Sequence, residues 1–216
     1  MTPLPGPTPA APGTAPPIAV GPNDPAGRAR GARLVTDGLE PKNWIIAVTL
    51  LTGWHADRWA GVGWGLVAAL FAGVIPILLI KAGERRGHWG DRHVRRRQDR
   101  LVVIPLIMAS VTLGMTLMLA FGAPAAMVAL VAAMLASLAV ILAVTTVWKV
   151  SVHTAVSSGA IVMLACQYGP WLLALHLLVA LVGWSRVALR DHTLAQVLVG
   201  TVLGAAVATP VFLALR

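Results

Sequence analysis

Charged residues are scarce in this chain, and their scarcity limits the classes of protein to which it can belong. They make up 12% of the 216 residues, whereas 57% are hydrophobic. This balance excludes an ordinary soluble domain and predicts an integral membrane protein. Cysteine is nearly absent as well: Cys166 stands alone within an apolar run, so no disulfide can form within the chain.

Acidic residues are the rarer of the charged types, which leaves a formal net charge of +9. In a soluble chain this excess would suggest a nucleic-acid partner. Here the basic residues are concentrated in loops that flank apolar runs, where they are typical of topological charge, anionic lipid headgroups or a phosphate-bearing substrate. We therefore expect membrane lipids as partners, and no nucleic acid.

Residues 1–38 lack apolar periodicity and hold nine of the fifteen prolines. Such a segment cannot bury enough surface to offset the entropy lost on ordering, so we predict a disordered tail. It does not resemble a secretory signal, because no basic segment precedes an apolar core. Residues 39–216 are then predicted to form one membrane-embedded domain.

Apolar blocks follow one another from residue 43 onward, and a helix needs roughly 20 residues to cross a bilayer core. The first block, residues 44–56, is short and ends at Asp57 and Arg58, so it is either a brief span or an interfacial helix. Six further blocks predict spans: 60–80, 101–121, 124–148, 155–167, 171–184 and 193–215. We therefore expect an all-α polytopic bundle of six or seven transmembrane helices.

Charged side chains nearly vanish from the second half of the chain. Between Arg100 and the terminal Arg216 they are Lys149, Arg186, Arg190 and Asp191. A charged group among membrane-length apolar segments costs several kcal/mol unless it is paired, hydrated or interfacial, so these residues are functional candidates. They fall in two stretches, which we call the Lys149 cluster (residues 149–154) and the His192 cluster (residues 185–196).

Two predicted spans separate the basic loop 81–100 from the Lys149 cluster, and two more separate that cluster from the His192 cluster. All three therefore fall on one membrane face, whether six or seven spans are counted. Between Lys81 and Arg190 this face carries at least eleven Lys and Arg in short loops. The positive-inside rule then predicts that both clusters face the cytoplasm, and we expect a bacterial-type plasma membrane.

His153 and His192 each lie beside a cation and a hydroxyl at the predicted start of a membrane helix. Helix N-termini offer unpaired N–H groups and a positive dipole end, which favour anions. Two imidazoles that converge with cationic donors could transfer a phosphoryl group without a metal: one attacks phosphorus and the other protonates the leaving oxygen. Residues that merely mark helix ends are the alternative that these observations leave open.

The other histidines have simpler interpretations. His55 and His176 are isolated and are expected to be interfacial or helix-packing residues, and His88 and His93 lie in the solvated basic loop. No spacing of His, Cys and carboxylates supports a metal site. We therefore expect neither a metal nor another cofactor.

The His192 cluster contains Ser185 and Arg186, then five residues, then His192. This pattern resembles the third signature of the phosphatidic acid phosphatase type 2 superfamily, which runs Ser-Arg, five residues, His, three residues, Asp. The chain departs from it at the last position, where Gln196 stands in place of the Asp.

The Lys149 cluster is similar to the second signature of that superfamily, Pro-Ser-Gly-His. Ser151 and His153 are kept, while Val150 and Val152 replace the proline and the glycine. The order of the two signatures and the 39-residue separation of the two histidines also suit the family. The resemblance covers roughly residues 60–215 and implies an all-α membrane core like that of the lipid phosphatases.

The resemblance implies a role for each matching residue. His192 would be the nucleophile that forms a transient phosphohistidine, and His153 the acid that protonates the leaving alcohol. Arg186 and Ser151 would bind the phosphate oxygens. Gln196 could still accept a hydrogen bond from the Nδ1–H of His192 one helical turn away, and so orient the ring, although it supplies no negative charge.

The first signature of the family, Lys, six residues, Arg-Pro, is not present as written. Near its expected place stand Arg97 and Arg100, with Leu101 in place of the proline. We expect Arg97 or Arg100 to reach the phosphate and Lys149 to supply the charge of the missing lysine. A run of topological arginines on a solvated face is the alternative for this loop.

The resemblance implies a membrane-bound phosphatase that hydrolyses an isoprenyl or glycerolipid phosphate or pyrophosphate. Two alternatives stay open: a phosphotransferase or lipid synthase that uses the same site, and a non-catalytic protein that binds lipid phosphates. A transporter is disfavoured because no paired, interrupted half-helices repeat across two halves of the chain.

Overall fold

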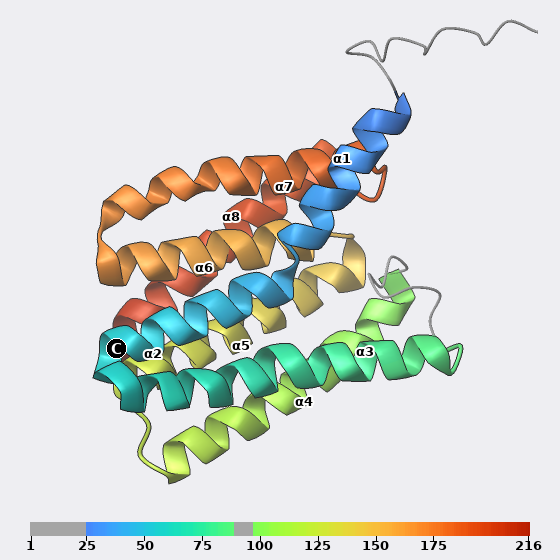
Figure 1. The fold of residues 1–216 in the computed structure, drawn as a ribbon. Coiled ribbons are helices and arrows are strands. Elements are labelled where there is room, and N and C mark those ends of the chain that lie inside the picture. The colour runs from blue at the N-terminus through green and yellow to red at the C-terminus, as the bar shows by residue number, and fades with distance from the viewer. Residues whose placement is uncertain (1–24, 89–96) are drawn as a thin grey trace, which may run out of the picture.

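The computed structural model describes residues 25–88 and 97–216, and within them it contains helices and no strand (Figure 1). The prediction of an all-α fold is confirmed for these residues. Five helical segments among them are long and apolar enough to cross a membrane. These segments are Ala26–Arg85, Gln98–Ala120, Ala125–Val147, Pro170–Ala188 and Leu194–Leu215.

Helix α1 (Pro25–Gly38) corrects the prediction that residues 1–38 form a disordered tail; residues 1–24 lie outside the described part of the chain. Ala32 and Thr36, one turn apart, are buried, and the helix packs against α7 (His176–Ala188). The Thr36 hydroxyl lies 3.0 Å from that of Ser185. Tertiary packing thus stabilises a short helix in which the small apolar side chains of Ala29, Ala32 and Val35 recur at helical spacing.

Helix α2 (Pro41–Ala69) reverses direction within its length. Asp57 and Arg58 have non-helical backbone angles, with Arg58 at φ 42°, and the chain turns back on itself there (Figure 1). A Cβ atom on Gly53 or Gly61 would collide with the backbone of the other residue, so the two arms touch through glycine. The block 44–56 is therefore the first arm of a helical hairpin.

The second arm of the hairpin continues through a π-helical turn, η1 (Leu70–Val74), into α3 (Ile75–Arg85). Helices α4 (Arg97–Ala120) and α5 (Ala125–Val147) then cross the bundle in opposite directions (Figure 1). The turn at Asp57 and Arg58 and residues 121–124 between α4 and α5 are short connections, as expected between antiparallel helices.

Helix α6 (Val152–Tyr168) is the most enclosed helix of the bundle and packs against α2, α7 and α8 (Leu194–Leu215). At its end, Gly169 adopts φ 117° and Pro170 opens a 3-10 turn, η2 (Pro170–Leu175), which leads into α7. A tight turn therefore joins the predicted spans 155–167 and 171–184. Pro170 takes a first-turn position, where its missing N–H costs nothing.

Helices α6 and α8 both begin at the same end of the bundle and run side by side (Figure 1). Small residues permit this approach: the Cβ that an alanine would place at Gly204 overlaps the carbonyl of Ala155, and Gly200 lies against the carbonyl of Ser151. The close contact brings the N-terminus of α6 next to the N-terminus of α8. This contact positions the two polar clusters.

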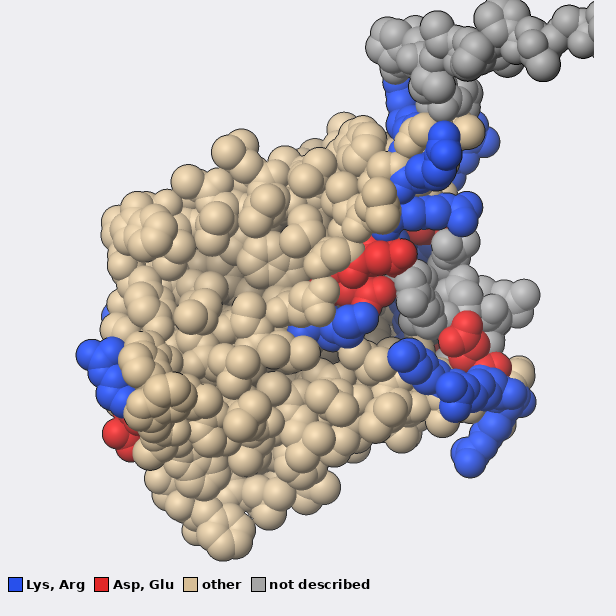
Figure 2. Space-filling view, in the orientation of Figure 1, with Lys and Arg blue, Asp and Glu red and all other residues tan. Residues whose placement is uncertain are grey.

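The charged residues gather at the two ends of the molecule. Figure 2 shows most Lys and Arg at the end where α1 lies, a small charged group at the opposite end and a wide uncharged belt between them. This distribution is compatible with an integral membrane protein, because a bilayer core favours an apolar belt with charges at its two surfaces.

Candidate active site

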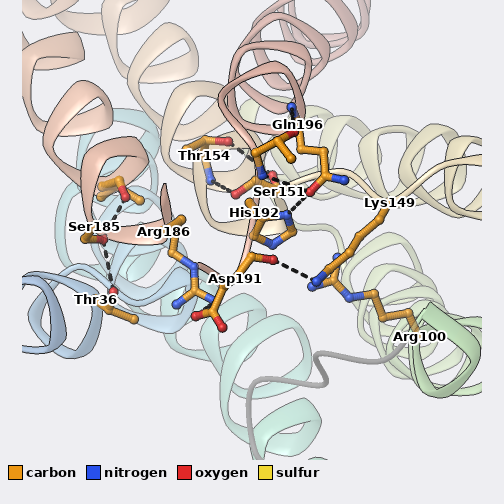
Figure 3. Close-up of polar contacts among 12 residues, drawn as sticks. Thr36, Arg100, Lys149, Ser151, Thr154, Ser185, Arg186, Asp191, His192 and Gln196 are labelled. Carbon is orange, nitrogen blue, oxygen red and sulfur yellow. Dashed lines mark hydrogen bonds and ion pairs between the residues drawn. The ribbon is translucent and has the colours of Figure 1, made fainter. Parts of the chain in front are cut away.

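The Lys149 cluster and the His192 cluster meet at one end of the bundle (Figure 3). The backbone N–H of Ser151 donates to the carbonyl of Gln196 over 3.2 Å. The Lys149 ammonium donates to the carbonyl of Asp191 over 2.7 Å. The two clusters, 39 residues apart at their histidines, thus form a single polar site.

Capping residues determine where the two helices begin. The side chain of Ser151 accepts a hydrogen bond from the Thr154 backbone at the start of α6. Thr193 and Gln196 form a reciprocal capping box at the start of α8. Such caps satisfy N–H groups that the helix itself leaves unpaired. They place His153 in the first turn of α6 and His192 just before α8.

The imidazole of His192 is buried, with 6% of its surface exposed. Its Nδ1 lies 3.0 Å from Oε1 of Gln196, and the same oxygen accepts a bond from the Thr193 backbone N–H over 3.3 Å. Because that oxygen accepts from a backbone donor, it is an acceptor for Nδ1–H as well. The lone pair of the neutral ring then lies on Nε2, which has no hydrogen-bond partner among the described residues.

The surroundings of His192 keep its ring neutral. Burial lowers its pKa most, and the positive charges of Arg100 and Lys149 lower it further, against the opposing effect of the Gln196 hydrogen bond. The pKa falls from 6.5 to about 3. A neutral imidazole is the nucleophilic form, so His192 is ready for nucleophilic attack across the whole physiological pH range.

Arg186 and Asp191 form a buried ion pair beside His192. Their charged atoms are 2.9 Å apart, and 1% and 8% of the two residues are exposed. In Figure 3 the Asp191 carboxylate points to the guanidinium, while the His192 ring points to Gln196. Asp191 is therefore the counter-ion of Arg186, and Gln196 is the partner of His192.

The loop between α7 and α8 folds back onto Arg186. The backbone N–H groups of Asp191 and His192 both donate to the carbonyl of Arg186, over 3.0 and 3.2 Å. Arg190 takes the left-handed conformation, with φ 57°, to permit this turn. The five residues between Arg186 and His192 thus close a tight turn that holds the guanidinium and the imidazole side by side.

Arg100 lies at the candidate active site, in the first turn of α4. It is 5% exposed, and its guanidinium donates to the carbonyl of Val150 over 2.8 Å. It lines a cavity together with His153, and its charge also acts on the His192 ring. The side chain of Arg97, the other arginine expected to bind phosphate, lies outside the described residues.

The sequence did not predict three features of the site. They are the contact of α1 with Ser185, the ion pair between Arg186 and Asp191, and the cavity beside His153. Only the ion pair left a signal in the sequence. A single carboxylate in a long apolar and otherwise basic region must be paired if it is buried. The other two depend on contacts between distant segments.

Two other histidines that the structure describes have ring contacts, whereas His88 is exposed, as expected for the basic loop. The His176 ring lies 3.2 Å from the hydroxyl of Ser158, and the His55 ring lies 4.8 Å from that of Tyr168. Among residues 25–88 and 97–216, no group of three or more His, Cys, Asp or Glu is arranged to hold a metal ion.

Comparison of the chain with known protein families, with curated proteins and with solved structures gives no match. The resemblance to the phosphatidic acid phosphatase type 2 superfamily therefore stays a prediction that depends on the residues of two signatures. The geometry of the site is therefore the evidence that bears on function.

Proposed function

We propose that this protein is a membrane-bound phosphatase of the phosphatidic acid phosphatase type 2 kind, which hydrolyses a lipid phosphate or pyrophosphate through a phosphohistidine on His192. The observation that carries the proposal is the buried, neutral His192 ring, oriented by Gln196 and with its Nε2 free of hydrogen bonds to the described residues. An imidazole in this state, surrounded by cations, is suited to attack a phosphate.

The first step transfers the phosphoryl group to the enzyme. Nε2 of His192 attacks phosphorus, the bond between phosphorus and the lipid oxygen breaks, and His153 donates a proton to that oxygen. Arg100, Lys149 and the N-terminus of α6 stabilise the negative charge on the phosphate oxygens. The Arg186 guanidinium joins them when the phosphate competes with Asp191 for it.

The second step releases phosphate. A water molecule attacks the phosphohistidine, His153 takes a proton from that water, and the bond between nitrogen and phosphorus breaks. Inorganic phosphate leaves and His192 returns to its neutral form. The chemistry uses two imidazoles and no metal, so we expect chelators to leave the rate unchanged and vanadate, which imitates pentacoordinate phosphorus, to inhibit.

The proposed topology has seven crossings: the two arms of residues 41–85, α4, α5, α6, the segment 170–188 and α8. Helix α6, at 17 residues, is shorter than the roughly 20 that a bilayer core requires, but its neighbours enclose it. The excess of Lys and Arg at the end that carries the site supports a cytoplasmic orientation in a bacterial-type plasma membrane.

Release of inorganic phosphate from a panel of lipid phosphates by the detergent-purified protein tests this proposal. We expect His192→Ala to lower kcat/KM by at least roughly a thousandfold, because it removes the attacking atom. His55→Ala, at the opposite end of the bundle, is the matched control and should leave the rate unchanged. Equal turnover by the wild type and His192→Ala would refute a phosphohistidine mechanism.

The Arg186–Asp191 ion pair favours a second candidate, a non-catalytic protein that binds lipid phosphates, because a paired guanidinium contributes less to turnover. In that case phosphate binding survives while no substrate in the panel is hydrolysed. Addition of an alcohol acceptor to the same assay separates a hydrolase from a phosphotransferase, since only the transferase would form a new phosphate ester.

A further inference from the structure

A cavity of about 250 Å³ lies among helices α2 to α6, which stand side by side in Figure 1. Its wall is mainly aliphatic, with methionines at its deep part. The polar side chains that line the cavity lie chiefly near the end of the bundle that holds the candidate active site. The basic ones are Lys42, Lys81, Arg100 and His153.

The cavity reaches about half-way through a membrane. On α4 the lining extends from Arg100 to Val111, and on α6 from His153 to Met163, which is ten or eleven residues along each helix. At 1.5 Å per residue these distances are about 15 Å. The hydrocarbon core of a bilayer is about 30 Å thick, so the cavity has the depth of one leaflet.

The volume of the cavity suits one hydrocarbon chain. An apolar cavity of about 150 Å³ binds benzene, which has six carbons, so a cavity of 250 Å³ holds about ten carbons by the same ratio. One extended chain of that length covers most of the depth of the cavity. Two such chains would need about twice the volume.

The mouth of the cavity is positively charged. Lys42 is paired with Glu40, and Lys81 and Arg100 add two further positive charges to the same wall. A mainly apolar cavity with cations at one end complements an amphiphile that has one apolar tail and an anionic head. Free phosphate would use the cations but would leave the apolar depth empty.

We infer that this cavity holds the tail of a single-chain lipid phosphate, such as a prenyl or alkyl phosphate, with the phosphate beside Arg100 and His153, which line the cavity near the candidate active site. The inference rests on the proposed function for the identity of the head group. It narrows the substrate class, because a diacyl glycerolipid phosphate can insert only one of its two tails.

Calorimetric binding of butyl, octyl and dodecyl phosphate to the purified His192→Ala variant, which lacks the attacking atom, tests this inference without turnover. We expect affinity to rise by on the order of tenfold or more from butyl to dodecyl phosphate, as each added methylene leaves water. Dioctanoyl phosphatidic acid should bind more weakly than dodecyl phosphate. An affinity that does not change with chain length would overturn the inference, and so would a preference for the diacyl lipid.

A matched pair of variants locates the tail. Ala160, on α6, is 2% exposed and lines the cavity, whereas Ala206, on α8, is exposed and lies away from it. Ala160→Phe should lower the affinity for dodecyl phosphate to near that for butyl phosphate and leave butyl phosphate unaffected. Ala206→Phe should change neither. Loss of chain-length preference in both variants, or in neither, would place the tail elsewhere.

The same samples separate this inference from the proposed function. If His192→Ala and the wild type both release no phosphate but the chain-length series still shows the expected rise, the phosphatase proposal fails and the tail site stands. If phosphate is released from butyl and dodecyl phosphate with equal KM, the phosphatase stands and the tail site fails. Ala72→Phe, on the opposite wall, repeats the test should Ala160→Phe misfold.

Discussion

The two ends of the bundle carry similar residue types in opposite environments. At the end opposite the candidate site, Arg58 lies over the ring of Trp54 and Arg216 over that of Phe212, and both arginines are exposed. At the site end, Arg100 and Arg186 are 5% and 1% exposed. Burial of a charge costs several kcal/mol unless it is paired, so exposed arginines can serve as interfacial anchors whereas buried ones need a partner or a function.

The comparison teaches which charged residues to treat as functional. The sequence does not distinguish the arginines at the two ends, because all of them stand next to apolar runs. The exposed fraction of each side chain does distinguish them. If burial makes this difference, a substitution at a buried position should have a larger effect than the same substitution at an exposed or open position.

The largest expected effect on stability follows from the loss of the buried carboxylate. Asp191→Ala leaves the Arg186 guanidinium buried without its counter-ion, so we expect the free energy of unfolding to fall by about 3–5 kcal/mol. Asp57→Ala, at the exposed turn of the α2 hairpin, should change it by no more than about 0.5 kcal/mol. Unfolding of both variants in mixed detergent micelles measures the difference, and equal effects would contradict it.

A smaller effect is expected from a methyl group between α6 and α8. Gly200→Ala would press a Cβ against the Ser151 carbonyl and the Thr154 hydroxyl, and should cost about 1–3 kcal/mol. Because these atoms belong to the start of α6, we also expect kcat to fall. Gly63→Ala, with nothing within 4 Å of the new Cβ, should be neutral or stabilising. Thermal unfolding and phosphate release distinguish the two glycines.

The smallest expected effect is a shift in pH dependence. His192 must be neutral to attack, so with a pKa of about 3 its protonation should reduce kcat/KM only as the pH falls towards that value. Gln196→Asp would place a carboxylate on Nδ1–H and raise the pKa, which moves the acid limb to higher pH. A pH profile of kcat/KM measures the shift. An acid limb at the same pH in both proteins would show that Gln196 does not act on the ring.

Most residues of the candidate site were predictable because they are polar or charged, whereas the segments around them are apolar. Lys149, His153, Arg186 and His192 stand out in apolar sequence, and the parity of the predicted spans places them on one face. Their roles stay predictions. The sequence indicates that Asp191 needs a basic partner if it is buried, but only the fold of the loop decides that the partner is Arg186.

The tail prediction failed for a related reason. Residues 25–38 carry a stripe of small apolar side chains, Ala29, Ala32 and Val35, but glycines and arginines interrupt it and it is too weak to predict a helix by itself. Ala32 and Thr36 pack on α7, where one hydroxyl pair and the burial of small side chains stabilise the helix. Packing partners that are 149 residues apart leave no trace in a local pattern.

The amino-acid sequence by itself determined the class of protein, the helices that begin near residues 41, 97, 125, 152 and 194, and the fact that the two polar clusters share one end of the bundle. These follow from local rules, because a chain in a bilayer must satisfy its backbone within each helix and keep its charges at the surfaces. Only the tertiary structure decided the hairpin at Arg58, the docking of α1, the partner of each buried charge and the cavity beside His153. Each of these depends on which distant side chains come within a few ångströms of one another.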